Sequence, residues 1–243
     1  MDESEGIVKP YYDDGRGIVI YNCDCREVLP TLGPVDLVLT DPPYGIALDT
    51  DNSRFSGGTR GNMAKSGNGK GTGAGAAIKN DESPFDPSFL SLYGEGQIVW
   101  GWNNYPNSFP AGACLVWIKR NDDAFGTFLS DAETAWMSKG HGVYCRRDLS
   151  NNAIALERVH PTQKPVGLMK WCLSFFPKAE SILDPFMGSG TTLVAAKQLG
   201  RRAIGIEIEE RYCEIAAKRL AQEVLDFAPA PESQPEQLSL EES

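Results

Sequence analysis

The sequence has little of what marks a metal site, a disulfide framework or a membrane protein. Only two of its 243 residues are histidine, and its six cysteines form no C-x-x-C pair, so neither a zinc site nor a set of disulfides is expected. No apolar run approaches the roughly 20 residues that cross a bilayer, and the acidic N-terminus MDESE lacks the pattern of a signal peptide. These absences favour a cytoplasmic protein with no metal and no membrane contact.

Each sign of charge is missing from one long segment. Residues 221–243 hold six acids and no Lys or Arg, whereas residues 52–79 hold five basic residues and no acid. The formal net charge of −10 at first argues against a nucleic-acid partner, but much of it lies in the tail. We expect residues 228–243 to be a disordered acidic tail, while the basic segment remains available to an anionic partner.

What is present predicts one α/β domain over residues 17–227, preceded by an N-terminal extension over residues 1–16. Short apolar runs predict strands at residues 17–22, 35–39, 97–100, 113–118, 132–137, 181–183 and 203–207. Helices are expected near residues 86–93, 165–176, 190–199 and 209–225. Strands that alternate with helices predict a doubly wound, mostly parallel sheet.

Two segments are expected to lie outside this alternation. Residues 46–80 are rich in glycine and have almost no large apolar side chain, which predicts a mobile loop. A flexible connector and a loop that orders around a substrate remain equal alternatives. Residues 138–160 are polar and are expected to be irregular.

The apolar run at residues 35–39 ends in a rigid corner, which we name the DPPY corner (residues 41–44). Its two prolines cannot donate a backbone hydrogen bond, and each fixes its own φ at about −65°. Pro42 also disfavours helical geometry at Asp41. The corner therefore presents one carboxylate, unpaired carbonyl oxygens and the ring of Tyr44 in a fixed relation.

A second strand ends in the sequence DPFMGSG, which we name the glycine loop (residues 184–190). Its glycines allow a ligand close to the backbone, and the following helix offers free N–H groups and a partial positive charge. Glu207 ends the next strand, where an acid can accept hydrogen bonds from ribose hydroxyls. The loop has neither the Gly-Lys-Ser/Thr of a P-loop nor the full dinucleotide fingerprint. It predicts a ribose-bearing ligand without a pyrophosphate, with a purely structural turn as the alternative.

With these motifs the sequence resembles the amino-group DNA methyltransferases that use S-adenosylmethionine. The DPPY corner is similar to the family's catalytic D/N/S-P-P-Y/F/W motif, and the glycine loop to its cofactor motif D-P-F-x-G-x-G. Residues 160–165, HPTQKP, resemble the segment that wraps the methionine end of the cofactor. The catalytic motif precedes the cofactor motif, which is the order called β in that family.

The resemblance implies a Rossmann-like, seven-stranded sheet with one antiparallel strand and a permuted motif order. It implies that the substrate is DNA and that the protein belongs to a restriction-modification system. Homodimers occur in this family, so a homodimer is an implied oligomeric state. Its implied catalytic residues are Asp41, Pro42, Pro43 and Tyr44. Its implied cofactor-binding residues are Asp24, Thr162, Lys164, Asp184, Pro185, Phe186, Gly188, Ser189, Gly190, Thr191, Thr192 and Glu207.

Residues 138–160 stand where the family carries a target-recognition segment, but here the segment is short. DNA contacts are therefore expected from it and from the glycine-rich loop together. The candidate residues are Arg54, Arg60, Lys65, Lys70, His141, Arg146 and Arg147.

The implied reaction is methyl transfer to the exocyclic N6 of an adenine that has been flipped out of the DNA. Asp41 and the Pro42 carbonyl would accept hydrogen bonds from the amine, and Tyr44 would stack on the base. In the family, Asp as the first motif residue favours adenine and Ser favours cytosine, so N4 methylation of cytosine is an alternative. A catalytically inactive protein that binds the cofactor or DNA is a further alternative from another class.

Overall fold

The computed structural model describes residues 8–45, 85–105, 107–126, 130–149 and 163–222. Five predicted site residues lie outside the described residues: Arg54, Arg60, Lys65, Lys70 and Thr162. The expected loop at residues 46–80 and the expected tail at residues 228–243 lie outside them as well.

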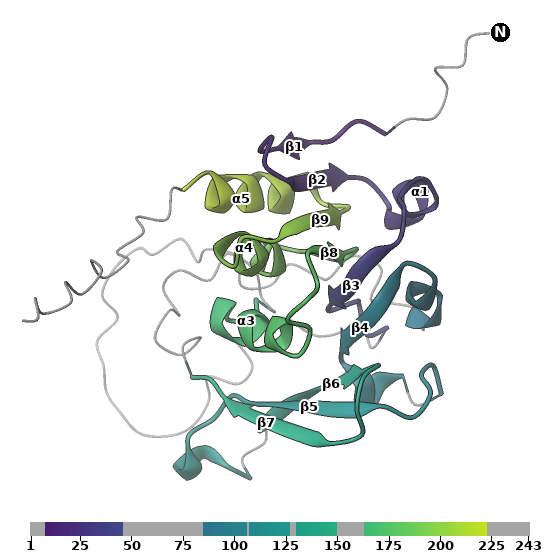
Figure 1. The fold of residues 1–243 in the computed structure, drawn as a ribbon. Coiled ribbons are helices and arrows are strands. Elements are labelled where there is room, and N and C mark those ends of the chain that lie inside the picture. Colours follow the sequence, from purple (N-terminus) through teal and green to yellow (C-terminus); the bar gives the residue numbers. More distant parts are fainter. Residues whose placement is uncertain (1–7, 46–84, 106, 127–129, 150–162, 223–243) are drawn as a thin grey trace, which may run out of the picture.

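The described residues form one nine-stranded sheet with the order β1-β2-β9-β8-β3-β4-β6-β5-β7 (Figure 1). Its strands are β1 (Tyr12–Asp13), β2 (Ile18–Asn22), β3 (Val35–Thr40), β4 (Gly94–Trp100), β5 (Ala113–Ile118), β6 (Ala132–Met137), β7 (Val143–Arg147), β8 (Ser181–Asp184) and β9 (Arg202–Glu207). The five neighbours from β2 to β4 are parallel to one another. β6 runs antiparallel between β4 and β5, β7 pairs parallel with β5, and β1 pairs antiparallel with β2.

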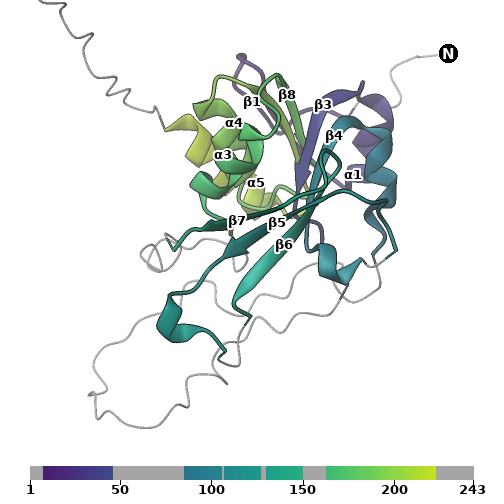
Figure 2. The same ribbon diagram turned by 60° about the horizontal axis from the view of Figure 1, so that its bottom comes forward.

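Helices cover both faces of the sheet, as a doubly wound fold requires (Figures 1 and 2). On one face lie α3 (Val166–Ser174), α4 (Thr191–Gln198) and α5 (Glu210–Ala221). On the other face lies α1 (Cys25–Val28), which the 3₁₀ turn η1 (Leu29–Thr31) extends. Three further 3₁₀ turns are η3 (Pro87–Leu92), η4 (Trp102–Asn104) and η5 (Asp122–Ala124).

The core consists of two apolar clusters, one on each face of the sheet. In β3, Leu37 and Leu39 join the cluster that contains α3 and α4, whereas Val38 joins the cluster that contains α1. Consecutive side chains of a strand point to opposite faces, and both faces of β3 are covered, so Val35 and residues 37–39 are all apolar and buried. Among the described residues, no helix is long and apolar enough to cross a membrane.

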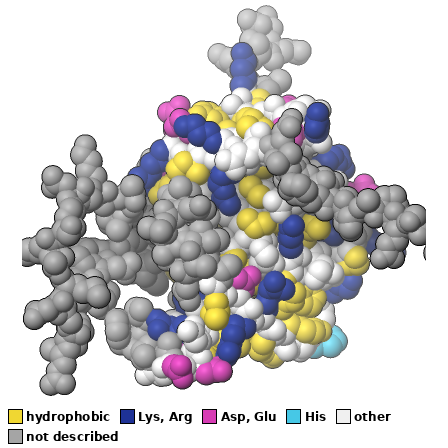
Figure 3. Space-filling view, turned by 90° about the vertical axis from the view of Figure 1, so that its left-hand side faces the viewer, with side chains coloured by type: hydrophobic (Ala, Val, Ile, Leu, Met, Phe, Trp, Pro, Cys, Tyr) yellow, Lys and Arg dark blue, Asp and Glu magenta, His cyan; other side chains and the backbone are white. Residues whose placement is uncertain are grey.

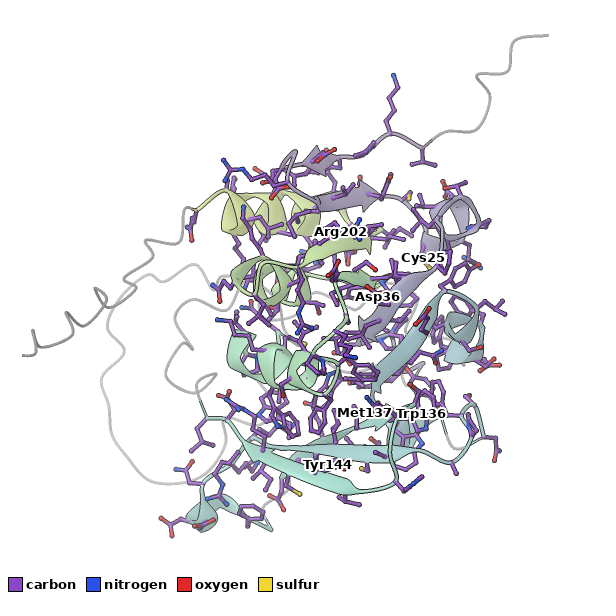
Figure 4. The ribbon with its side chains drawn as sticks, viewed as in Figure 1. Cys25, Asp36, Trp136, Met137, Tyr144 and Arg202 are labelled. Carbon is purple, nitrogen blue, oxygen red and sulfur yellow. The ribbon has the colours of Figure 1, made fainter. Side chains whose placement is uncertain are left out.

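The amino end of β3 is fixed to β8 by Asp36, which Figure 4 labels between these two strands. Its Oδ2 accepts hydrogen bonds from the backbone N–H of Glu180 and from the N–H and hydroxyl of Ser181, each at 2.8 Å. These three bonds set the register of β3 against β8. The carboxyl ends of the two strands are thereby brought level with each other.

The α/β, mostly parallel architecture predicted from the sequence is confirmed, but two details of that prediction were wrong. Among the described residues the sheet has nine strands rather than seven, since β1 and β7 add to its edges, and two antiparallel strands rather than one, since β1 joins β6. Residues 143–147 form a strand although residues 138–160 were expected to be irregular. This edge strand is largely exposed, so it lacks an apolar run. The helix expected near residues 86–93 is present as the six-residue 3₁₀ helix η3.

Candidate active site

The DPPY corner and the glycine loop emerge side by side at one edge of the sheet. The corner follows the last residue of β3, and the loop begins with the last residue of the parallel neighbour β8. Thr40 Oγ1 donates a hydrogen bond of 2.7 Å to Asp184 Oδ1, which joins the two. Glu207 ends β9, the next strand along the sheet. The prediction that both motifs emerge at one edge of the sheet is therefore confirmed, and open α/β sheets bind ligands at that edge.

Hydrogen bonds and close packing hold the DPPY corner rigid. The Tyr44 hydroxyl donates to Asp41 Oδ1 at 2.6 Å. The Tyr105 hydroxyl lies 2.8 Å from the Pro43 carbonyl oxygen and 3.3 Å from that of Pro42. Gly101, at φ +78°, lies against the Tyr44 ring so closely that a Cβ atom there would overlap it. Ring, carboxylate and carbonyl groups are thus fixed relative to one another.

Behind the corner, Lys164 bridges two acids. Its ammonium bonds to Asp41 Oδ2 and lies 3.3 Å from Glu133 Oε2. Lys119 Nζ donates to the other Glu133 oxygen at 2.7 Å. The Lys164 side chain is 5% exposed, whereas Asp41 and Glu133 are 23% and 28% exposed. Its Nζ also lies 5.3 Å from the centroid of the Trp100 ring, within the range of a cation–π contact.

These contacts set the charge of the corner. Burial raises the pKa of Asp41 above its ordinary value, although the Lys164 ammonium opposes the rise. Burial disfavours the charged form of Lys164, yet Asp41 and Glu133 together raise its pKa, so it stays an ammonium. Burial likewise disfavours the charged form of Glu133, but Lys164 and Lys119 lower its pKa. Lys164 was predicted to contact a cofactor; the structure shows it bound to carboxylates, and the cofactor contact stays a prediction.

The glycine loop is held by its backbone. Gly188 and Gly190 adopt φ values of +50° and +76°, which residues other than glycine rarely adopt. The Gly188 N–H donates to Glu207 Oε2 at 3.0 Å, and the Glu209 N–H donates to Oε1 at 2.8 Å. A Cβ atom on Gly190 would lie 2.7 Å from the Cβ of Ala216 in α5. The loop therefore closes directly on that helix.

The hydroxyl groups within the glycine loop and directly after it are turned toward the protein. The Arg219 guanidinium bonds to the Ser189 carbonyl and lies 3.2 Å from Ser189 Oγ and 3.3 Å from Thr191 Oγ1. Thr192 Oγ1 lies 3.7 Å from Met169 Sδ. All three side chains are buried. A cofactor contact from these residues would use their backbone groups.

The remaining predicted cofactor residues surround the same loop. Asp184 is buried, and burial raises its pKa to about 6 despite hydrogen bonds that favour its charged form. The Phe186 ring meets Phe85 edge-on at 5.3 Å, and Pro185 is buried. Asp24 caps α1 and accepts two side-chain hydrogen bonds from Arg26, so this carboxylate already has a cationic partner.

The described DNA-contact candidates lie at the far edge of the sheet from β2. Arg147 pairs with Asp122 at 2.6 Å, and Arg146 Nε lies 3.8 Å from Asp148 Oδ2. His141 is exposed just before β7. On the face in Figure 3, Lys and Arg side chains are scattered among uncharged ones rather than gathered in one patch. DNA contact by these three residues stays a prediction.

Four residues at the site were not singled out for it from the sequence: Glu133, Lys119, Gly101 and Arg219. Glu133 offered one signal, since it is an acid within the apolar run of β6. Tyr105 lies in the sequence WNNY that leaves β4, and its hydroxyl bonds to the Pro43 carbonyl of the DPPY corner.

The fold is a Rossmann-like methyltransferase fold. The crystal structure of the M1.HpyAVI–SAM complex matches with a TM-score of 0.52 and 21% identity, covering 84% of this chain and 99% of that one. The cytosine-N4-specific PvuII DNA methyltransferase also matches with a TM-score of 0.52, at 16% identity over 84% and 86% of the two chains. At such low identity these likenesses concern the fold alone.

Sequence relatives identify the family. A family model described as DNA methylase (N6_N4_Mtase) matches residues 115–218. "Putative methylase YubD" of Escherichia coli (strain K12) is 31% identical over 82% of this chain and 88% of its own length. "Type II methyltransferase M2.DpnII" of Streptococcus pneumoniae is 29% identical over 89% and 94%. The chain belongs to the S-adenosylmethionine-dependent DNA amino-methyltransferases.

Proposed function

We propose that this protein transfers a methyl group from S-adenosylmethionine to the exocyclic N6 of an adenine flipped out of DNA. One observation carries the proposal. The Asp41 carboxylate and the Pro42 carbonyl stand at the end of β3, and the Thr40–Asp184 hydrogen bond of 2.7 Å ties them to the glycine loop at the end of β8. An acceptor pair for an amine thus lies directly beside a loop suited to a ribose-bearing cofactor.

The residues of the glycine loop fit S-adenosylmethionine. Each Glu207 oxygen accepts one backbone N–H, which leaves further lone pairs for the two ribose hydroxyls. Gly188 and Gly190 keep the loop free of side chains, so a ligand can approach its backbone. Asp24, Phe186 and Lys164 would complete the site with Thr162. When bound, the cofactor supplies an electrophilic methyl group on a sulfonium sulfur.

The DPPY corner would act on the target amine. The lone pair of that amine is delocalised into the base, which makes it a poor nucleophile. Hydrogen bonds from its N–H groups to Asp41 and to the Pro42 carbonyl would localise the lone pair, and these acceptors would stabilise the positive charge that develops on nitrogen. Both Asp41 oxygens already accept one bond and retain acceptor capacity for the amine.

The base itself would stack on Tyr44. Flipping a base out of the duplex costs a few kcal/mol, and stacking on an aromatic ring returns roughly 1–3 kcal/mol. The Tyr44 ring is braced by its bond to Asp41 and by Gly101, so little freedom is lost when the base binds. The base and the two acceptors would then be held in one geometry, which itself speeds the reaction.

Adenine is preferred over cytosine because Asp41 is the first residue of the motif, and in the family Asp favours adenine. The test is incubation of unmethylated DNA, duplex and single-stranded, with tritiated S-adenosylmethionine, followed by analysis of the nucleosides. N6-methyladenine is the expected product. N4-methylcytosine would keep the class and overturn the base, and absence of transfer would leave a protein that only binds cofactor or DNA.

A further inference from the structure

The DPPY corner is backed by a group of four charged residues that we name the Asp41 cluster: Asp41, Lys119, Glu133 and Lys164. The two acids share the Lys164 ammonium, and Lys119 lies 2.7 Å from Glu133 on the side away from Asp41. They come from different elements: Glu133 from β6, Lys119 from the residue after β5, and Asp41 from the residue after β3. Of the four only Lys164 is buried, and burying its charge is costly unless it is paired; Asp41 and Glu133 supply that pairing.

We propose that Glu133 and Lys164 are positioning residues for methyl transfer. Lys164 holds the Asp41 carboxylate in one orientation, and Glu133 shares the Lys164 ammonium so that the negative charge of Asp41 is only partly cancelled beside the reacting amine. This inference rests on the proposed function. It assigns to Glu133 a role in the reaction although that residue lies behind the DPPY corner.

The sharing of one ammonium between two acids carries the argument. If Lys164 paired with Asp41 alone, the pair would be nearly neutral, and a neutral pair does little for positive charge that develops on nitrogen. With Glu133 at 3.3 Å from the same Nζ, part of the Lys164 charge is balanced by the second acid. Asp41 then faces the amine as a carboxylate whose negative charge is only partly cancelled. That negative charge stabilises the positive charge that develops on the amine nitrogen.

The position of Glu133 is built into the sheet. β6 pairs with β4 on one side and β5 on the other, and Glu133 stands opposite Trp117 in the ladder. Its carboxylate is fixed from the other side by Lys119. The Lys164 stem is buried, and its ammonium lies over the Trp100 ring. Glu133 is therefore held in place by Lys119, and Lys164 by its contact with Trp100.

The cluster makes a specific prediction for the pH dependence of transfer, because Asp41 must be ionised to accept from the amine. The titratable groups that face Asp41 are Tyr44, Lys164, Glu133 and Asp184. Lys164 lowers the pKa of Asp41 and Glu133 raises it. Removing Lys164 therefore moves the acid limb of the rate profile to higher pH, whereas removing the charge of Glu133 moves it to lower pH.

The experiment measures single-turnover methyl transfer against pH for wild type, Lys164→Met and Glu133→Gln. We expect both variants to be slower at neutral pH, by about 10-fold or more, with acid limbs displaced in opposite directions by about one pH unit. Cofactor affinity should stay close to that of wild type in Glu133→Gln, because Glu133 is bonded to Lys164 and Lys119. In Lys164→Met cofactor affinity is measured separately from the rate, because Lys164 is also a proposed cofactor contact. Glu214→Gln is the matched control, since Glu214 is paired with Lys218 at 2.6 Å on the exposed face of α5.

Lys164→Arg guards against loss of folding, because it keeps the cation and should keep the acid limb near that of wild type. If Lys164→Met does not fold, the Glu133→Gln profile alone decides. If the acid limb moves in the same direction in both variants, or does not move in either, the inference is overturned, provided that the wild-type enzyme methylates DNA. If wild type transfers no methyl group, the proposed function fails instead, so the two failures are distinguishable.

Discussion

The DPPY corner and the glycine loop end neighbouring strands, yet they are built by different means. Side-chain charges and hydroxyl groups hold the corner, and its acid depends on a buried ammonium. The glycine loop depends on its backbone. Gly188 and Gly190 have positive φ values, the Gly188 N–H donates to the Glu207 carboxylate, and Gly190 packs directly on α5. This edge of the sheet therefore separates two tasks: paired side-chain charges gather at the proposed reacting amine, whereas the proposed cofactor meets a closely packed backbone and the Glu207 carboxylate.

The comparison predicts which property each region controls. A change in the corner should alter the rate of transfer and leave cofactor binding intact, because the hydrogen bond to the glycine loop comes from Thr40, which precedes the corner. A change in the glycine loop should alter stability and cofactor affinity together, because the conformation of the loop and its packing on α5 are inseparable. Four substitutions test this separation.

The largest effect is expected from Asp41→Ala. It removes the carboxylate that accepts from the amine, so the rate of transfer should fall by roughly 10³-fold or more. Lys164 keeps Glu133 as its partner, and the fold should therefore survive. Rate is measured by tritium transfer and cofactor affinity by calorimetry.

Asp41→Asn is the matched control, because it keeps the shape of the side chain and loses its charge. A loss of rate as large as that of Asp41→Ala would assign the effect to charge. A collapse of cofactor affinity in either variant would contradict the separation of tasks.

The second effect concerns the glycine loop. Gly190→Ala must adopt φ +76° and place its Cβ 2.7 Å from the Cβ of Ala216, so we expect a loss of about 2–4 kcal/mol in the free energy of unfolding. Cofactor affinity should fall with it. Urea denaturation and calorimetry measure the two quantities.

Gly15→Ala separates strain from crowding, since Gly15 has φ +66° and no atom near its missing Cβ. We expect it to cost about 1 kcal/mol from backbone strain alone. An equal cost for both substitutions would mean that α5 does not brace the loop.

Much of this edge could be predicted from the sequence, since each motif is a local string that follows an apolar strand. Asp41 and Asp184 were found because a rigid or glycine-rich turn surrounds each one. Glu133 and Lys164 could not be assigned to each other, because they meet only after β6 pairs with β4 and the segment before α3 returns to the sheet. β7 was missed for a related reason: an exposed edge strand carries no apolar run. A local pattern in the sequence predicts a turn or a buried strand. An ion pair between elements that are distant in the sequence can be predicted only when the order of the strands in the sheet is known.

The third effect lies on the link between the two regions. Thr40→Val removes the hydroxyl that donates to Asp184 and leaves a buried carboxylate oxygen short of one donor. We expect a loss of about 1.5–2 kcal/mol in the free energy of unfolding, together with smaller reductions in both rate and cofactor affinity. Thr40→Ser keeps the hydroxyl and serves as its control. Full activity and stability in Thr40→Val would show that the two loops are placed by the strands alone.

The smallest effect is a pH dependence of stability that comes from Asp184. Its pKa in the folded protein is about 6, above the ordinary 3.8, because burial disfavours the charged carboxylate. As pH falls through 6, the folded state binds a proton that the unfolded state binds only near 4, so this group adds stability on going from pH 7 to pH 5, by roughly 1 kcal/mol. Asp184→Asn cannot bind that proton, while its amide oxygen still accepts from Thr40. The free energy of unfolding, measured in urea at pH 7 and pH 5, should therefore rise less in the variant than in wild type. An equal rise in both proteins would mean that Asp184 is still charged at pH 5 and that burial does not raise its pKa.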